Sequence, residues 1–291
     1  MSGGHLYDAP GPRGRRRIRI ATVVAGLALV GIAALVVRRL AANGQFAAAK
    51  WSPLFDPNDA NFADLWRLFG GGLLHTLTAA ALAMSLSLPF GVLIAATRIS
   101  ASRWYRGIIV GTVEILRAVP VVIAIFFAYQ VLPTYGLKLP LLWYIVIGLT
   151  AYNSVVISEI VRAGILAVPK GQSDAAAALG LTRAQSMRFI LLPQAFRSML
   201  PALISQLVVI LKDTSLGAFI AYEELLRRGL IAIQTLHNPI QTYLVIAAIF
   251  IGINYLASRL AIYVEARLST RRSVPPSEDR QINSSVPATV P

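Results

Sequence analysis

The stretch DAAAALGLTRAQSMRFILLP, residues 174–193, is the segment of this 291-residue sequence that says most about its fold. Pro169 suits the first turn of a helix, and the alanines that follow Asp174 favour its continuation. Gly180 can close that helix in a left-handed conformation. Thr182 and Gln185 have the spacing of a capping box, which starts a second helix that Pro193 is predicted to stop. The stretch therefore predicts two short helices joined by a tight glycine turn.

Long apolar segments flank this hairpin on both sides. Hydrophobic residues make up 56% of the chain and charged residues only 14%, and the mean hydropathy is +0.65. These values indicate a membrane protein, because a soluble domain carries more charge. A span needs about 20 mainly apolar residues. We expect an all-α, polytopic membrane helix bundle with six transmembrane helices, at about 20–37, 73–96, 107–132, 141–164, 202–221 and 240–263.

The basic residues predict which ends of these spans face the cytoplasm. Most Lys and Arg residues outside the spans fall in cytoplasmic segments if both termini lie inside, as the positive-inside rule favours. Arg38 and Arg39, just beyond the first span, are a local exception. The first span has a basic flank like that of a signal peptide, but its length favours a retained anchor helix.

The hairpin lies within residues 165–200, a cytoplasmic segment longer than an ordinary connection. Its alanines give the first helix a thin profile, which suits insertion into a groove of a partner protein. A hairpin lying on lipid head groups is the alternative, and the composition leaves both open.

The spacing of these residues resembles the EAA loop of ABC-importer permeases. The matching elements are Asp174-Ala175-Ala176, Gly180 and residues 190–193, although Asp174 stands where the family usually has Glu. Further segments are similar to the permeases for polar amino acids, the histidine, glutamine, arginine and glutamate group, and most of all to glutamate-uptake permeases. These segments are residues 116–120, 151–152, 159–165, 171–172, 192–195 and 211–216. At 117–120 the chain has Arg-Ala-Val-Pro where that family commonly shows Arg-Gly-Thr-Pro.

The resemblance implies a five-helix type I ABC-importer core preceded by one additional helix. The expected division is a basic cytoplasmic tail (1–19), the extra transmembrane helix (20–40), an external loop (41–69), the importer domain (70–265) with its coupling loop (165–200), and a disordered cytoplasmic tail (266–291). It also implies that the coupling loop contacts ATPase subunits through Pro169, Gly171, Asp174, Ala175, Ala176, Gly180 and Pro193.

The partners that the resemblance implies are a dimer of ATP-binding cassette subunits, a second permease subunit or a copy of this chain, and an extracytoplasmic solute-binding protein. ATP and Mg²⁺ would be bound by the ATPase, and no cofactor is expected in this chain. The location implied is the bacterial cytoplasmic (inner) membrane.

Ionisable residues inside spans are costly and therefore candidates for function. Glu114 and Arg117 lie three residues apart, close enough to pair, and Pro120 is expected to bend the helix just beyond them. Arg117 could be the counter-charge of a substrate carboxylate. The alternative is an ion pair that only braces the bundle.

A second group of candidates lies in the fifth span, where Lys212 and Asp213 are followed by Thr214 and Ser215. Adjacent residues point about 100° apart on a helix, so each charge needs another partner unless the helix unwinds. A role in the pathway and a bracing role both stay open.

The fourth span holds three more candidates. Asn153 could line the pathway or form hydrogen bonds between helices. Glu159 and Arg162 lie near the cytoplasmic end, where they are expected to anchor the coupling loop.

Several function classes are excluded by missing residues. The chain has no cysteine and only three distant histidines, so we expect no metal site. No phosphate loop, H-E-x-x-H or G-x-S-x-G motif occurs, which argues against an ATPase or an intramembrane enzyme. The basic residues lie between the apolar runs, a pattern that orients a protein in a membrane. Nucleic acid is therefore not an expected partner.

The function expected from the sequence is that of a permease subunit, not an enzyme. It would translocate a polar amino acid, glutamate or a related one, with ATP hydrolysed by a separate subunit. A secondary transporter driven by an ion gradient is the alternative, but it leaves the hairpin at 165–200 unexplained.

Overall fold

The computed structural model describes residues 11–100 and 103–269. These residues form helices and connections without a strand. Five helices are long and apolar enough to cross a membrane, and a bent pair gives a sixth span if it is counted as one. The predicted all-α membrane bundle is confirmed.

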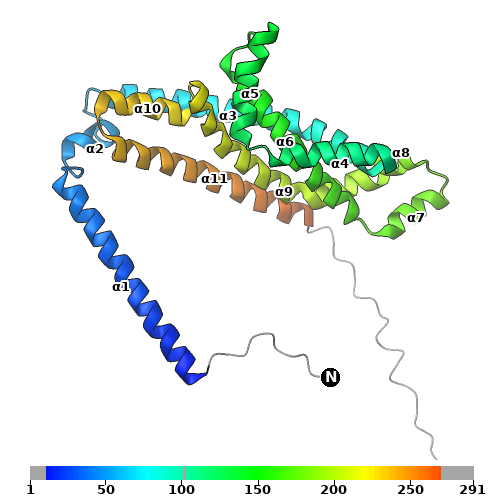
Figure 1. Ribbon diagram of the computed structural model, residues 1–291, viewed down its shortest axis with the longest axis horizontal. Coiled ribbons are helices and arrows are strands. Elements are labelled where there is room, and N and C mark those ends of the chain that lie inside the picture. The colour runs from blue at the N-terminus through cyan, green and yellow to red at the C-terminus, as the bar shows by residue number, and fades with distance from the viewer. Residues whose placement is uncertain (1–10, 101–102, 270–291) are drawn as a thin grey trace, which may run out of the picture. The chain divides into compact units, whose positions relative to one another are not determined.

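The helices follow one another along the chain with short connections (Figure 1). In order they are α1 (Pro12–Ala42), α2 (Ala48–Phe55), α3 (Phe62–Ser100), α4 (Arg103–Ala118), α5 (Val121–Val131), the 3₁₀ helix η1 (Leu132–Tyr135), α6 (Leu141–Leu166), α7 (Lys170–Ala178), α8 (Arg183–Gln185), the π-helical segment η2 (Ser186–Leu191), α9 (Leu192–Asp213), the 3₁₀ helix η3 (Thr214–Ile220), α10 (Leu225–Leu236) and α11 (Pro239–Ser269). They divide into two compact units, residues 1–67 with 230–245 and residues 68–229 with 246–291.

The larger unit is built around α6, which packs against α5 on one side and α9 on another. The centre of this packing contains Ile125, Ile145, Leu149 and Ile210, all fully buried. Gly148 lets α5 and α6 approach closely, because a Cβ there would lie 2.6 Å from the Ile125 Cα. The resulting apolar core holds the spans in fixed register.

The third predicted span, 107–132, is not one straight helix. It consists of α4 and α5, which meet at 95° across a short break. Pro120 is the residue just before α5 and has an extended backbone, with φ −58° and ψ 137°. Proline has no N–H to donate and its ring clashes with the preceding turn, so a helix arriving at residue 120 must end or turn. The expected bend is confirmed, and α4 and α5 together account for the predicted third span if the bent pair is counted as one span.

The hairpin follows the predicted pattern through its turn and then departs from it. Gly180 has φ +75°, and Thr182 and Gln185 form the complete capping box. The second helix, however, does not stop at Pro193, because η2 leads directly into α9. Pro193 lies in the first turn of α9, where a missing N–H is tolerated.

In the smaller unit, the segment 41–69 is more than a loop. It contains α2 and the first turns of α3. The Trp51 Nε1 donates to the Gln45 carbonyl oxygen at 3.0 Å, and the buried Asn238 donates to the Lys50 carbonyl oxygen at 3.1 Å. These bonds satisfy polar groups that would be costly to bury unpaired.

The two predicted tails are covered only in part. Residues 12–19 of the first tail belong to α1, which begins at Pro12, and α11 continues to Ser269. The expected disorder beyond that point falls on residues 270–291, which lie outside the described residues.

Candidate functional site

The hairpin consists of α7, α8 and η2, and its alanines differ in exposure: some face solvent, and Ala176 packs inside the hairpin. Ala176 is buried, in the helix that packs against η2, whereas Asp174 and Ala175 are exposed. Leu179 is the apolar side chain at the tip, with 80% of its surface exposed. The predicted contact residues therefore differ in role: Ala176 supports the hairpin, and Asp174, Ala175 and Gly171 face outward.

Hydrogen bonds fix the turn and the base of the hairpin. The Leu181 N–H donates to the Ala176 carbonyl oxygen at 3.1 Å, which closes the first helix around Gly180. At the base, the Gln194 Nε2 donates to the Gln172 Oε1 at 3.1 Å. This hydrogen bond between two glutamines was not predicted, because they are 22 positions apart and no local sequence pattern indicates that they are in contact.

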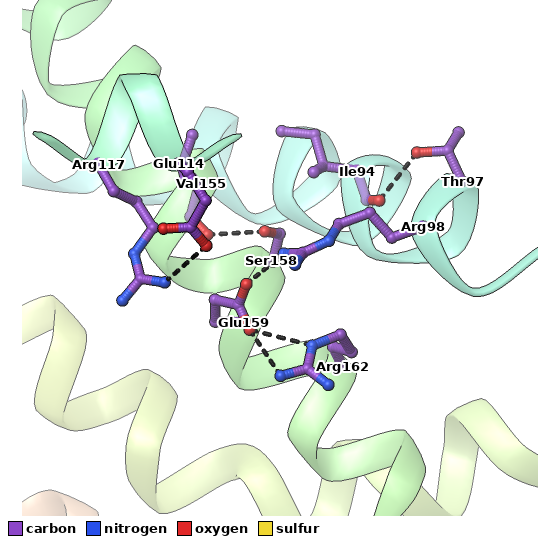
Figure 2. A network of polar contacts seen from close by, with 9 residues as sticks. All are labelled: Ile94, Thr97, Arg98, Glu114, Arg117, Val155, Ser158, Glu159 and Arg162. Carbon is purple, nitrogen blue, oxygen red and sulfur yellow. Dashed lines mark hydrogen bonds and ion pairs between the residues drawn. The ribbon is translucent and has the colours of Figure 1, made fainter. Parts of the chain in front are cut away.

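Glu159 accepts hydrogen bonds from two arginines, as Figure 2 shows. Arg162 contributes its Nε at 3.0 Å and its Nη2 at 2.9 Å, both to Oε2, and Arg98 of α3 contacts Oε1 through Nη1. The Arg98 side chain is only 10% exposed. Of the ion pairs between described side chains, Arg98–Glu159 is the one that joins two different membrane-spanning helices.

Arg98 is a functional candidate that sequence reasoning missed. Its only sequence signal was a charge close to the end of a span, and nothing in the sequence indicated a partner 61 residues away. Together the three side chains join α3 to the last turns of α6, shortly before α7 begins.

Glu114 and Arg117 form the predicted pair on α4, with Nη1 and Oε1 3.5 Å apart. Both side chains are about half exposed, and Arg117 lies one residue before the end of α4. The pair (Figure 2) is not joined by a described ion pair to the Glu159 group. A half-exposed pair beside a broken helix keeps donors and acceptors available to a ligand.

Lys212 and Asp213 are the last residues of α9, where the chain tightens into the 3₁₀ helix η3. Neither forms an ion pair with the side chains that the structure describes. Thr214 is buried and donates to the Leu211 carbonyl oxygen at 2.7 Å, and Ser215 donates to the Lys212 carbonyl oxygen at 2.7 Å. The two hydroxyls thus bind backbone carbonyl oxygens at the change of helix type, and the two charges form no ion pair with a described side chain.

Asn153 lies fully buried between α6 and α9. Its Oδ1 accepts from the Gln206 Nε2 at 2.7 Å, and its Nδ2 donates to the Leu149 carbonyl oxygen at 2.8 Å. Of the two interpretations of Asn153, this geometry matches hydrogen bonding between helices.

Glu224 is a buried carboxylate that the sequence did not single out. Its oxygens accept from the backbone N–H groups of Leu226 at 2.8 Å and Arg227 at 2.7 Å, so it caps the start of α10. Burial raises the pKa of Glu224 to about 7, against the lowering effect of the two N–H groups. Glu224 lies outside the candidate spans, so the rule that charges inside a membrane span are functional candidates does not apply to it.

The segment before α10 is held against α3 by several contacts. Tyr222 donates its hydroxyl to the His75 carbonyl oxygen at 3.1 Å, and the His75 Nδ1 lies 2.9 Å from the Glu223 carbonyl oxygen. The Leu225 N–H donates to the Thr76 hydroxyl at 3.2 Å. Glu224 is therefore fixed within a rigid junction between α3 and α10.

A bundle of candidate membrane-spanning helices, with a capped hairpin in the chain between two of them and helix breaks beside charged residues, is typical of a polytopic transport protein. The chain belongs to the family described as the binding-protein-dependent transport system inner membrane component, whose profile matches residues 87–270.

Two similar proteins match most of the chain. It is 39% identical over 238 residues to the glutamate transport system permease protein GluD of Corynebacterium glutamicum, which covers 80% of this chain and 85% of GluD. It is 35% identical over 212 residues to the probable glutamine ABC transporter permease protein GlnP of Bacillus subtilis (strain 168), covering 71% of this chain and 94% of GlnP.

Two solved structures have similar folds. A crystal structure of an amino acid ABC transporter with histidines matches with a TM-score of 0.65 and 30% identity, covering 71% of this chain and 96% of that one. An inward-facing MetNI methionine ABC transporter matches with a TM-score of 0.52 at 22% identity, over 66% of this chain and 92% of that one, and supports the fold alone.

Proposed function

We propose that this chain is the membrane-spanning subunit of an ABC importer that carries a polar amino acid, with glutamate or a related acidic amino acid as the substrate. The observation that carries the proposal is the hairpin, with Gly180 at φ +75° and a complete capping box. A stand-alone transporter has no evident use for it. The glutamate and glutamine names of GluD and GlnP support the substrate class.

The hairpin is the proposed docking element for a dimer of ATP-binding cassette subunits. Its exposed residues Asp174, Ala175 and Leu179 would enter a groove of the ATPase, which binds ATP and Mg²⁺ itself. A second permease subunit or a second copy of this chain would complete the pathway, and an extracytoplasmic solute-binding protein would deliver the substrate. Both termini would then lie in the cytoplasm, on the side of the hairpin.

Movement of the hairpin would reach the membrane helices through rigid contacts. Gly164 of α6 packs tightly against Met199 of α9, since a Cβ on Gly164 would lie 3.1 Å from the Met199 side chain. A second contact between α6 and α9 is the hydrogen bond from Gln206 of α9 to Asn153 of α6. Glu159 ties α6 to Arg98 of α3. We propose that these contacts anchor the hairpin to the bundle.

The proposed substrate contacts are the charges beside the two helix breaks. Arg117 precedes the α4–α5 break, and Lys212 precedes the change from α9 to η3. Broken helices expose backbone groups and helix ends that bind ions and substrates in many transporters. An arginine can bind a carboxylate through two parallel hydrogen bonds.

Reconstitution tests this function directly. The chain would be placed in proteoliposomes alone and together with its candidate ATPase and solute-binding protein, and glutamate uptake and ATP hydrolysis would be measured. We expect uptake only from the complete assembly. Uptake by the chain alone, driven by an ion gradient, would instead establish a secondary transporter.

A further inference from the structure

The first turns of α1 carry a dense group of positive charges. Five arginines, Arg13, Arg15, Arg16, Arg17 and Arg19, precede an apolar run at 20–37. Because α1 begins at Pro12, these arginines lie on the helix itself rather than in a separate tail. Against the described residues, no residue of α1 is buried.

The five arginines fall on two opposite faces of α1. At about 100° per residue, Arg13, Arg16 and Arg17 fall within one arc of about 100°, and Arg15 and Arg19 point away from it. The first three line a hollow of about 340 Å³ together with Gly14 and Ile20.

The apolar run fixes the depth of this hollow in a membrane. Residues 20–37 span about 27 Å at 1.5 Å per residue, close to the thickness of a hydrocarbon core. Ile20 then lies at the edge of the core, and the arginines one to two turns before it lie at the level of the lipid phosphates. Val24 and Leu27 continue the face that Ile20 begins, and both are exposed.

We propose that Arg13, Arg16 and Arg17 bind the phosphate of an anionic phospholipid, whose acyl chain lies along Ile20, Val24 and Leu27. The guanidinium group matches phosphate oxygens in charge and in geometry. The apolar face beside it favours a lipid over a soluble phosphate. The site lies outside the family match at residues 87–270, so it does not depend on the transport function proposed above.

The two faces of α1 provide a matched test. The full-length chain would be purified in a neutral detergent, phosphatidylglycerol would be titrated in, and bound lipid would be counted by native mass spectrometry. One variant combines Arg13→Gln with Arg17→Gln, and its control combines Arg15→Gln with Arg19→Gln. Each variant loses two charges four residues apart, and detergent removes any effect on membrane orientation.

We expect the Arg13/Arg17 variant to bind phosphatidylglycerol about 30-fold more weakly, and its control to lose less than about threefold. Equal losses would overturn the site, because charge alone would then explain binding, and so would no loss in either variant. Equally tight binding of phosphatidylcholine would contradict recognition of the anionic headgroup. Displacement by inorganic phosphate at matched concentration would show that the acyl chain contributes nothing.

Discussion

Arg98 and Glu159 illustrate how one residue can join two helices that are far apart in the sequence. A partly buried charge is stable only if an opposite charge or several hydrogen bonds compensate it. Glu159 receives three such bonds, one of them from another helix. The consequence is that Arg98 contributes more to stability than an arginine on an exposed face.

Replacing Arg98 by alanine should destabilise the chain by about 2 kcal/mol, since Glu159 would keep a single charged partner in a partly buried position. Thermal unfolding in detergent measures this loss. Arg67→Ala is the control, because Arg67 pairs with Asp64 on the same helix and both side chains are 78% exposed. That change should cost less than about 0.5 kcal/mol. Equal effects would show that Arg98 does not brace the bundle.

Glu224 should make stability depend on pH. Burial raises its pKa from 4.5 to about 7, so the folded state binds the proton more tightly than the unfolded state. This contribution is fully present below about pH 4.5 and is lost as the pH rises through 7. The difference is on the order of 3 kcal/mol.

Melting temperatures measured from pH 4.5 to 8 would reveal this dependence. Glu224→Gln keeps an acceptor for the α10 cap and should flatten the slope in that range. Glu223→Gln removes a neighbouring carboxylate that is mostly exposed and should leave the slope intact. A Glu224→Gln profile as steep as that of the parent chain would contradict the assignment.

At the scale of elements, the sequence predicted the existence of helices better than their continuity. Apolar runs of sufficient length indicated all six spans, because length and hydropathy are local properties. The 95° angle between α4 and α5 depends on what each half packs against, which no local pattern contains. Likewise, Pro193 has the appearance of a stop signal, yet a proline is also compatible with the first turn of α9.

The hairpin should depend on the conformation of one glycine. Gly180→Val forces a β-branched residue to φ +75°, which is strongly unfavourable, and should abolish co-purification with the candidate ATPase. Gly136→Val is the control, because Gly136 also has a left-handed backbone, with φ +85° and open space around it, but lies outside the hairpin. That variant should bind normally. ATPase binding by a folded Gly180→Val protein would exclude the hairpin as the docking element.

For the molecule as a whole, the sequence was sufficient for the class of protein and insufficient for the arrangement of its site. Residues joined by short spacings, such as Glu114 with Arg117 and Thr182 with Gln185, were found from the pattern alone. Contacts between distant segments, such as Gln172 with Gln194, required the fold. For Lys212 and Asp213, the described side chains include no ion-pair partner, so the fold of this chain does not assign their role.

The complete transporter should distinguish substrates by charge if Arg117 binds a carboxylate of the side chain. Arg117→Ala should reduce glutamate uptake at least about tenfold more than glutamine uptake, since only glutamate loses a charged hydrogen-bond partner. Initial uptake rates in proteoliposomes with both partners present measure this ratio. Equal losses for the two substrates would favour a bracing role for the Glu114–Arg117 pair.

The π-helical segment η2 has a consequence for the orientation of the hairpin around the axis of α9. A π-helical turn contains one residue more than an α-helical turn, so it changes the angular phase of everything before it by about 100°. Deleting one residue between Ser186 and Leu191 would restore a regular helix into α9. The deletion would rotate α7 to a different side of the α9 axis without changing the sequence of α7. The direction in which α7 projects from the axis of α9 therefore depends on the number of residues in η2 as well as on the side-chain contacts of the hairpin.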